Sequence, residues 1–156
     1  MANRWVGITV SGDKVTLVDA DITDSGPIVL LADQSWNLQK GDRADAYHVM
    51  YQQISDYLTE NGIKRAIVKK SALSTGSTKL SHLNAAELRG VVIAASAAAV
   101  KTRMIAKAHM SRTFGSRKVD EYVADDDFWT AETTGATLRK GSREAAMVLL
   151  AARNEQ

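Results

Sequence analysis

The sequence contains no cysteine, one proline and no long hydrophobic run. Without cysteine the chain can form neither disulfides nor thiolate metal sites, which fits a reducing compartment, and we expect a cytoplasmic protein. Residues 1–8 lack the apolar core and cleavage site of a signal peptide. The longest apolar run, residues 90–100, is about half of the roughly 20 residues that span a bilayer, so we expect no membrane partner.

Histidine is also scarce. His48, His82 and His109 are far apart and show none of the short spacings that are typical of zinc ligands. We interpret them as ordinary surface or helix-face residues, and we expect no metal and no cofactor. Residues 74–79 are rich in serine and threonine but lack the pattern of a nucleotide-binding loop. We interpret this segment as a flexible loop, with an anion contact as the alternative.

Charge is present in quantity and is unevenly distributed. Residues 1–61 carry 4 Lys+Arg and 9 Asp+Glu, residues 62–118 carry 12 and 1, and residues 119–156 carry 4 and 8. The balances of −5, +11 and −4 give the net charge of +2. The basic middle indicates an anionic partner, nucleic acid above all, or pairing with acidic flanks of the same chain or a second subunit.

The hydrophobic pattern predicts one α/β domain over residues 1–156. Alternating apolar residues indicate strands, and apolar residues at helical spacing indicate helices. The predicted strands cover residues 4–10, 14–21, 28–38, 63–69 and 101–107. The predicted helices cover residues 42–61, 85–100 with Asn84 as the N-cap, and 142–153.

Three short motifs occur in this order of elements. They are Val6-Gly7-Ile8-Thr9-Val10-Ser11-Gly12, Ala66-Ile67-Val68-Lys69-Lys70-Ser71 and Ser142-Arg143-Glu144-Ala145-Ala146. Together they resemble the ribonuclease H-like fold, and in particular its branch of Holliday-junction resolvases (RuvC-like). The resemblance covers nearly the whole chain. It implies a mixed five-stranded sheet, with three antiparallel strands and then two parallel ones, and helices on both faces.

The resemblance also implies where a catalytic site would lie. In the family, three acidic residues from these motifs hold two divalent cations at the end of the sheet. Here the three positions are Thr9, Lys70 (Lys69 if the register differs by one residue) and Glu144. An ammonium group would repel a cation by about 4 kcal/mol per unit charge at an effective dielectric near 20. We therefore predict a degenerate site with no catalytic residues.

Other carboxylates do not obviously replace the missing ones. Asp13 lies in the predicted hairpin turn, and Asp19 and Asp21 lie at the opposite end of the second strand. We interpret residues 125–127, three consecutive aspartates, as a solvated loop or a helix cap rather than a metal site.

The basic middle gives the candidate nucleic-acid contacts. Phe114 is the only aromatic ring between residues 62 and 118, so phosphate contacts are favoured over base stacking. The predicted binding residues are Lys69, Lys70, Lys79, Arg112, Arg117 and Lys118. Three hypotheses remain open: a degenerate resolvase-like domain that binds or scaffolds, an active metal-dependent nuclease with a non-standard site around Glu144, and a protein-binding or self-assembling domain.

Overall fold

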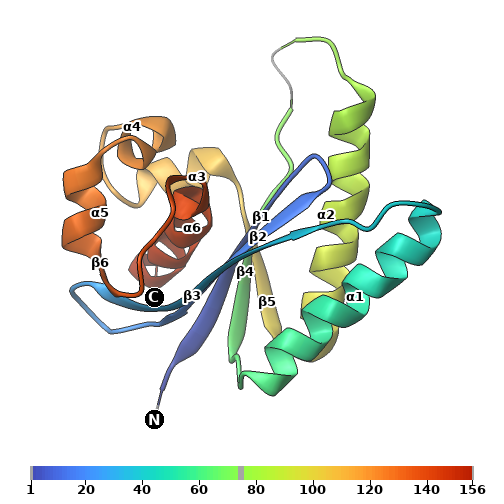
Figure 1. Ribbon diagram of the computed structural model, residues 1–156. Coiled ribbons are helices and arrows are strands. Elements are labelled where there is room, and N and C mark those ends of the chain that lie inside the picture. The colour runs from blue at the N-terminus through green and yellow to red at the C-terminus, as the bar shows by residue number, and fades with distance from the viewer. Residues whose placement is uncertain (1, 74–75, 156) are drawn as a thin grey trace.

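A mixed β-sheet runs through the centre of the computed structural model, which describes residues 2–73 and 76–155 (Figure 1). Among these residues the sheet has six strands in the order β5-β4-β1-β2-β3-β6. β2 pairs antiparallel with β1 and β3, whereas β4 is parallel to β1 and β5, and β6 is parallel to β3. The strands are β1 (Arg4–Ser11), β2 (Lys14–Asp21), β3 (Ile28–Asn37), β4 (Arg65–Lys69), β5 (Lys101–Ile105) and β6 (Thr133–Gly135).

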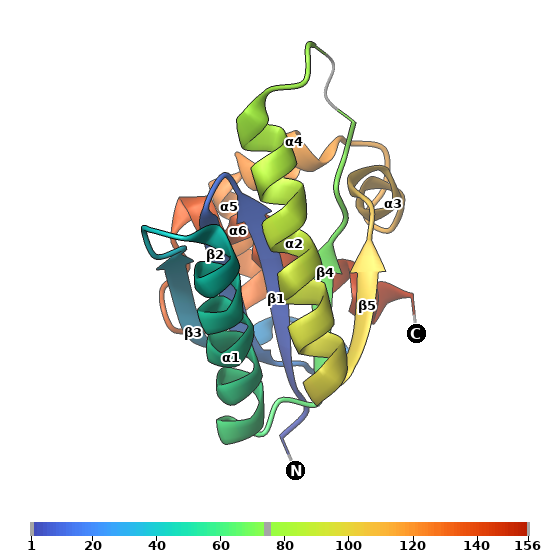
Figure 2. The same ribbon diagram turned by 90° about the vertical axis from the view of Figure 1, so that its right-hand side faces the viewer.

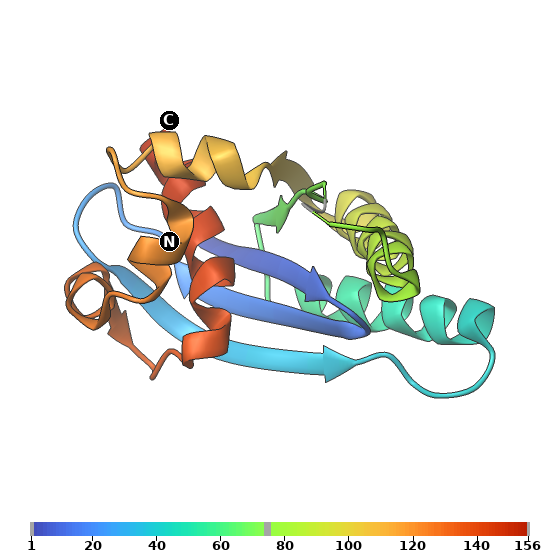
Figure 3. The same ribbon diagram turned by 90° about the horizontal axis from the view of Figure 1, so that it is seen from above.

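Helices cover both faces of the sheet, as predicted. α1 and α2 lie on one face, and α6 lies on the other with α3, α4 and α5 beside it (Figures 1 and 3). No helix in the described part of the chain is long and apolar enough to cross a membrane. The helices are α1 (Arg43–Glu60), α2 (Leu80–Ala99), α3 (Lys107–Arg112), α4 (Val119–Val123), α5 (Asp126–Glu132), a 3₁₀ turn (Lys140–Ser142) and α6 (Arg143–Asn154).

The alternation of the strands divides the interior into two cores. Trp5 of β1 and Ile67 of β4 belong to the core under α6. Val6, Ile8 and Val68 belong to the core under α1 and α2. Successive strand residues point to opposite faces, so both faces are apolar because each is covered by helices.

Gly7 sets the closest approach between the sheet and α6. A Cβ atom at this position would lie 2.0 Å from the carbonyl oxygen of Ala145 and 2.9 Å from Cγ of Leu149. Glycine is therefore required here for space and not for a special backbone conformation. This contact places the first turn of α6, with Glu144, directly against the sheet.

The prediction of five strands was wrong. β6 adds a sixth strand by pairing in parallel with residues 28–30 of β3. It contains three residues, Thr133, Thr134 and Gly135, in a polar stretch. A segment this short has no alternation for sequence reasoning to detect, and its pairing depends on α5 delivering it to the sheet edge.

The start of α2 was also misplaced. The helix begins at Leu80 and not at residue 85, so Asn84 lies inside it and is not its N-cap. The backbone N–H of Lys79 donates to Nδ1 of His82 at 3.2 Å, which satisfies one donor at the actual helix start. Of the predicted serine- and threonine-rich loop, residues 74 and 75 lie outside the described residues.

Three short helices lie between the fifth and sixth strands, where the sequence predicts no helix. α3, α4 and α5 enclose four aromatic rings, whose neighbouring centroids are 5.0–5.9 Å apart. Asp125 caps α5, because its Oδ1 accepts from the N–H of Phe128 at 3.2 Å. The interpretation of the aspartate run as a helix cap is thus confirmed. The four rings are those of Phe114, Tyr122, Phe128 and Trp129.

Candidate functional site

The register between β1 and β4 identifies which lysine occupies the second position of the predicted site. Ile8 is paired with Val68, so the next residues along the two parallel strands are Thr9 and Lys69. Both lie on the face under α6, because side chains alternate along each strand. Lys70 follows the end of β4 and is exposed. The residue that meets the site is therefore Lys69, one position before the principal prediction.

Lys69 and Glu144 form an ion pair between the end of β4 and the first turn of α6. Their side chains are 24% and 26% exposed. Oε1 of Glu144 is buried and makes no hydrogen bond within the described chain, so the Lys69 ammonium is its compensating group. The acidic residue of the third motif thus faces a cation of the chain itself.

A second ion pair continues this charge cluster. Nζ of Lys107 lies 2.8 Å from Oδ1 of Asp120. The hydrogen bond that Lys107 donates to Asp120 and the nearby charge of Glu144 raise the pKa of Lys107, although burial opposes this. The same hydrogen bond, with the charge of Lys69, lowers the pKa of Asp120. Positive and negative groups alternate across the site, and each carboxylate is already compensated.

This donor set does not fit the divalent cations that the resemblance implies. Magnesium prefers several charged oxygen ligands in near-octahedral geometry. The three positions supply one threonine hydroxyl, one ammonium and one carboxylate, and the ammonium is bound to that carboxylate. Within residues 2–73 and 76–155, no group of three or more His, Asp or Glu side chains is arranged to hold a metal ion.

The other carboxylates considered as replacements have partners elsewhere. Asp13, in the turn between β1 and β2, pairs with Arg43 at the start of α1, and its Oδ1 lies 3.1 Å from Nη2 of Arg43. Asp19 is fully buried at the opposite end of the strands, where it accepts hydrogen bonds from Arg4 and Tyr57. Neither residue faces the cluster around Glu144.

Two of the six predicted nucleic-acid contacts are neutralised within the chain. Lys69 is bound to Glu144. Nη1 of Arg117 lies 3.0 Å from Oδ2 of Asp125, and its guanidinium lies 4.3 Å from the centre of the Tyr122 ring. The hydrogen bond that Arg117 donates to Asp125 also raises the pKa of Arg117. These two cations serve first to hold the chain together.

The other four predicted cations are exposed. The charged groups of Lys70, Lys79, Arg112 and Lys118 form no ion pair in the part of the chain that is described. Arg112 contacts only His109, at 3.3 Å. β1, β4 and β5 are parallel, so their carboxyl ends meet at one edge of the sheet. Figure 2 shows α3, α4 and the beginning of α2 at that edge. Arg112 ends α3, Lys79 and Lys118 directly precede α2 and α4, and Lys70 directly follows β4.

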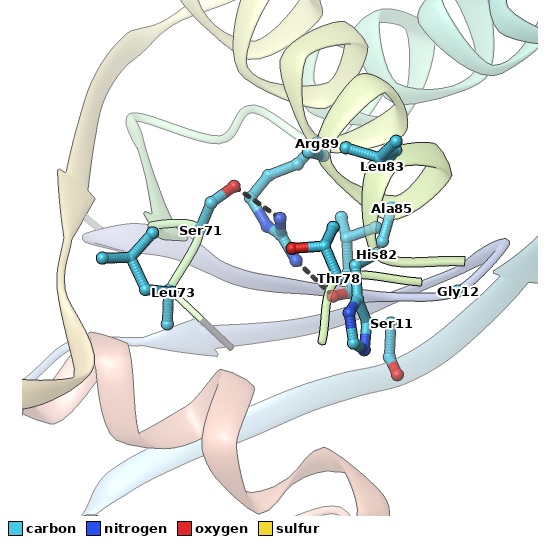
Figure 4. A pocket seen from close by; sticks show the side chains of 12 residues that line it. Ser11, Gly12, Ser71, Leu73, Thr78, His82, Leu83, Ala85 and Arg89 are labelled. Carbon is cyan, nitrogen blue, oxygen red and sulfur yellow. Dashed lines mark hydrogen bonds between the residues drawn. The ribbon is translucent and has the colours of Figure 1, made fainter. Parts of the chain in front are cut away.

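Sequence reasoning missed Arg89, which reaches from α2 into a pocket at the same edge (Figure 4). Its Nη1 donates to Oγ of Ser71 at 2.6 Å, and its Nη2 donates to the carbonyl oxygen of Val10 at 2.7 Å. The available signal was a lone arginine between Leu88 and Gly90 in an apolar helix.

The sheet order, the helices on both faces and the placement of α6 define a ribonuclease H-like fold of the Holliday-junction-resolvase type. RuvC of Thermus thermophilus matches it with a TM-score of 0.69 and 12% identity, over 97% of this chain and 95% of that one.

T. thermophilus RuvC in complex with a Holliday junction substrate also gives a TM-score of 0.69, with 11% identity over 97% and 93% of the two chains. The yeast mitochondrial Holliday junction resolvase Ydc2 gives 0.65, with 11% identity over 98% and 80%. No protein-family model and no curated protein matches the sequence. Identities this low establish the shared fold and nothing further.

Proposed function

We propose that this chain is a non-cleaving resolvase-like domain that binds nucleic acid through phosphate contacts at the carboxyl ends of β1, β4 and β5. The observation that carries the proposal is the Lys69–Glu144 ion pair, which lies where the fold would otherwise gather metal-binding carboxylates. A domain with this pair can contact a phosphate but cannot hold two cations beside it.

The exposed cations supply the binding half of the proposal. Lys70, Lys79, Arg112 and Lys118 lie at the edge where the parallel strands end. Phosphate neutralisation by lysine and arginine dominates nucleic-acid affinity and carries no sequence information. T. thermophilus RuvC, which has the same fold, has been seen with a Holliday junction substrate. We therefore assign this chain a sequence-tolerant, salt-sensitive interaction.

The assembly hypothesis is less well supported, because acidic flanks already pair with the basic middle inside one chain. Lys107 binds Asp120, and Arg103 binds Glu155. Like the pairs made by Lys69 and Arg117, these contacts join the basic middle to the acidic C-terminal stretch. A second copy is not needed to compensate these charges.

A cleavage assay tests the catalytic half. Duplex, branched and hybrid nucleic acids incubated with magnesium or manganese are expected to stay intact, because the site offers one carboxylate that is already paired. Cleavage that disappears in Glu144→Ala would instead support the hypothesis of an active nuclease with a non-standard site.

Fluorescence anisotropy over a salt series tests the binding half. Lys70→Ala and Lys79→Ala are each expected to lower the slope of log affinity against log salt by about one unit, without changing sequence preference. Lys64→Ala is the matched control, because Lys64 is exposed but precedes β4 at the opposite edge. No affinity at any salt concentration, with a stable oligomer in sedimentation, would favour the assembly hypothesis.

A further inference from the structure

Arg89 differs from most arginines of this protein because it is half-buried without a carboxylate partner. Buried charges are normally paired, since removal from water without compensation is costly. The Arg89 guanidinium donates two hydrogen bonds, one to the hydroxyl oxygen of Ser71 and one to the carbonyl oxygen of Val10, and both acceptors are neutral. The buried Nε of Arg89 has no partner within the described chain. The arginines with a carboxylate within 4 Å are Arg4, Arg43, Arg103, Arg117, Arg139, Arg143 and Arg153.

The surroundings of Arg89 leave its positive charge without a counterion. Burial lowers the pKa of Arg89, and no acidic group opposes that effect. The guanidinium still keeps its charge, because arginine is not deprotonated in proteins. With five N–H donors and two of them used, it can still donate to a ligand oxygen.

The pocket beside Arg89 has room for a small organic ligand. It has a volume of about 660 Å³ and lies between the β1–β2 turn, the segment after β4 and the first turns of α2. Figure 4 shows Arg89, Ser71 and Thr78 on its walls. This volume is within the usual range of ligand pockets, about 300–1,000 Å³. An inorganic phosphate alone would leave most of it empty.

Apolar side chains also line the pocket, beside the polar Ser11 and His82. Leu73 and Leu83 line it, and their side chains are 99% and 54% exposed. Ala85 and Ala86 add small side chains from α2. A ligand that suits both the arginine side and the leucine side of the pocket has an anionic group that binds Arg89 and a flat, weakly polar body that packs against the leucines.

We propose that this pocket binds a nucleotide, with its phosphate at Arg89 and its base against Leu73 and Leu83. The nucleotide has two possible sources, a free nucleoside monophosphate or the phosphorylated terminus of a nucleic-acid strand. Both present the same phosphomonoester and base to the pocket. The second source would extend the proposed function by adding a terminus-specific contact to the surface that carries Lys70 and Lys79.

Calorimetric titration of the full-length protein tests the proposal with three probes: inorganic phosphate, a nucleoside, and the corresponding nucleoside monophosphate. The nucleoside monophosphate is expected to bind at least about tenfold more tightly than either of the others, since only it engages both parts of the pocket. Oligonucleotides with and without a 5′-phosphate then separate the two sources. A preference for the 5′-phosphorylated strand assigns the site to strand ends, and equal binding of the two assigns it to the free nucleotide.

Two matched substitutions on α2 decide whether binding occurs in this pocket. Leu83→Glu places a negative charge on the wall and is expected to weaken nucleotide binding about tenfold or more. Leu80→Glu adds the same charge to a more exposed residue that does not line the pocket, and binding should be retained. Because Leu80 and Leu83 are exposed, neither change threatens the fold. Arg89→Gln is also expected to abolish binding, but it removes the hydrogen bonds of a half-buried side chain and therefore tests the fold as well as the pocket.

Equal binding by Leu83→Glu and Leu80→Glu, or no preference of the unchanged protein for the nucleoside monophosphate, would overturn the proposal. Neither outcome touches the proposed function, because the salt slopes of Lys70→Ala and Lys79→Ala are measured separately on nucleic acid. Conversely, the protein could bind the nucleotide and show no affinity for nucleic acid. That result would support the nucleotide pocket and reject the proposed function.

Discussion

Two ion pairs of the sheet, Arg4–Asp19 between β1 and β2 and Lys69–Glu144 between β4 and α6, differ in how completely they are satisfied. At one end, Asp19 is fully buried and accepts from Nε of Arg4 at 3.0 Å, from its Nη2 at 2.5 Å and from the hydroxyl of Tyr57 at 2.7 Å. At the other end, Lys69 and Glu144 are each about one quarter exposed. Oε1 of Glu144, which faces Lys69, has no partner besides that ammonium group within the described chain.

The difference separates an enclosed structural pair from one that is open to solvent. Burial and the hydrogen bond to Asp19 raise the pKa of Tyr57, which shows how closely the first pair is enclosed. A network in which every group has a partner rigidifies a core. The second pair is open to solvent and lies where β1, β4 and α6 converge. Replacing its side chains should therefore cost less free energy of unfolding than replacing those of the first pair.

Asp19→Ala is expected to have the largest effect on stability. The change leaves Arg4 without its carboxylate and Tyr57 without its acceptor. Removal of one partner from a buried pair costs about 3–5 kcal/mol, and the partial exposure of Arg4 places the expected loss at the lower end. Denaturant unfolding measures it. Asp13→Ala, which breaks the exposed pair with Arg43, should cost less than about 1 kcal/mol. If Asp19→Ala and Asp13→Ala lose the same free energy of unfolding, the buried pair is no more important for stability than the exposed one.

Gly7→Ala tests the contact that holds α6, and with it Glu144, over the sheet. The added methyl group would meet the backbone of residue 145, which cannot rotate away, so we expect a loss of about 2–3 kcal/mol in the free energy of unfolding. Gly90→Ala is the matched control. Gly90 lies in α2 with open space around it, and alanine there should stabilise by about 0.5–1 kcal/mol. A neutral Gly7→Ala would mean that α6 is not held by this approach.

The central part of the fold could be predicted because burial imposes a period on it. Val6, Ile8 and Trp5 alternate between two apolar cores, and this pattern is visible in the sequence. β6 and the helices α3 to α5 could not be predicted, because they are too short to show a period. Their positions depend on tertiary contacts among aromatic rings such as Phe114 and Tyr122.

The candidate site could be predicted to within one residue. The resemblance carried by the three motifs implies Thr9, Glu144 and a lysine for it, but the choice between Lys69 and Lys70 depends on the register of β4 against β1. A shift of one residue turns a side chain to the other face of the sheet, and the sequence does not contain that register. Arg89 was missed for a related reason, since its acceptors come from Val10 and Ser71, both distant in the sequence.

A smaller effect on stability than that of Asp19→Ala or Gly7→Ala is expected where the open pair is redesigned. Thr9→Asp with Lys69→Glu would place three carboxylates, with Glu144, where β1, β4 and α6 meet. Without metal, their mutual repulsion should cost about 1–2 kcal/mol at a partly exposed site. Manganese should bind in calorimetric titration and restore the loss, since charged oxygens are the ligands that such cations prefer.

The matched variant is Thr9→Asp with Lys70→Glu, which has the same composition but keeps the ammonium of Lys69 at the site. Lys70 lies beyond the end of β4 and is exposed, so its replacement should add no manganese binding over the unchanged protein. Binding by the variant at residue 69 but not by the one at residue 70 would show that one ion pair separates this site from a metal-binding one. If the two variants bind manganese equally, the register does not control the site, and the second position belongs to whichever carboxylate can reach Glu144.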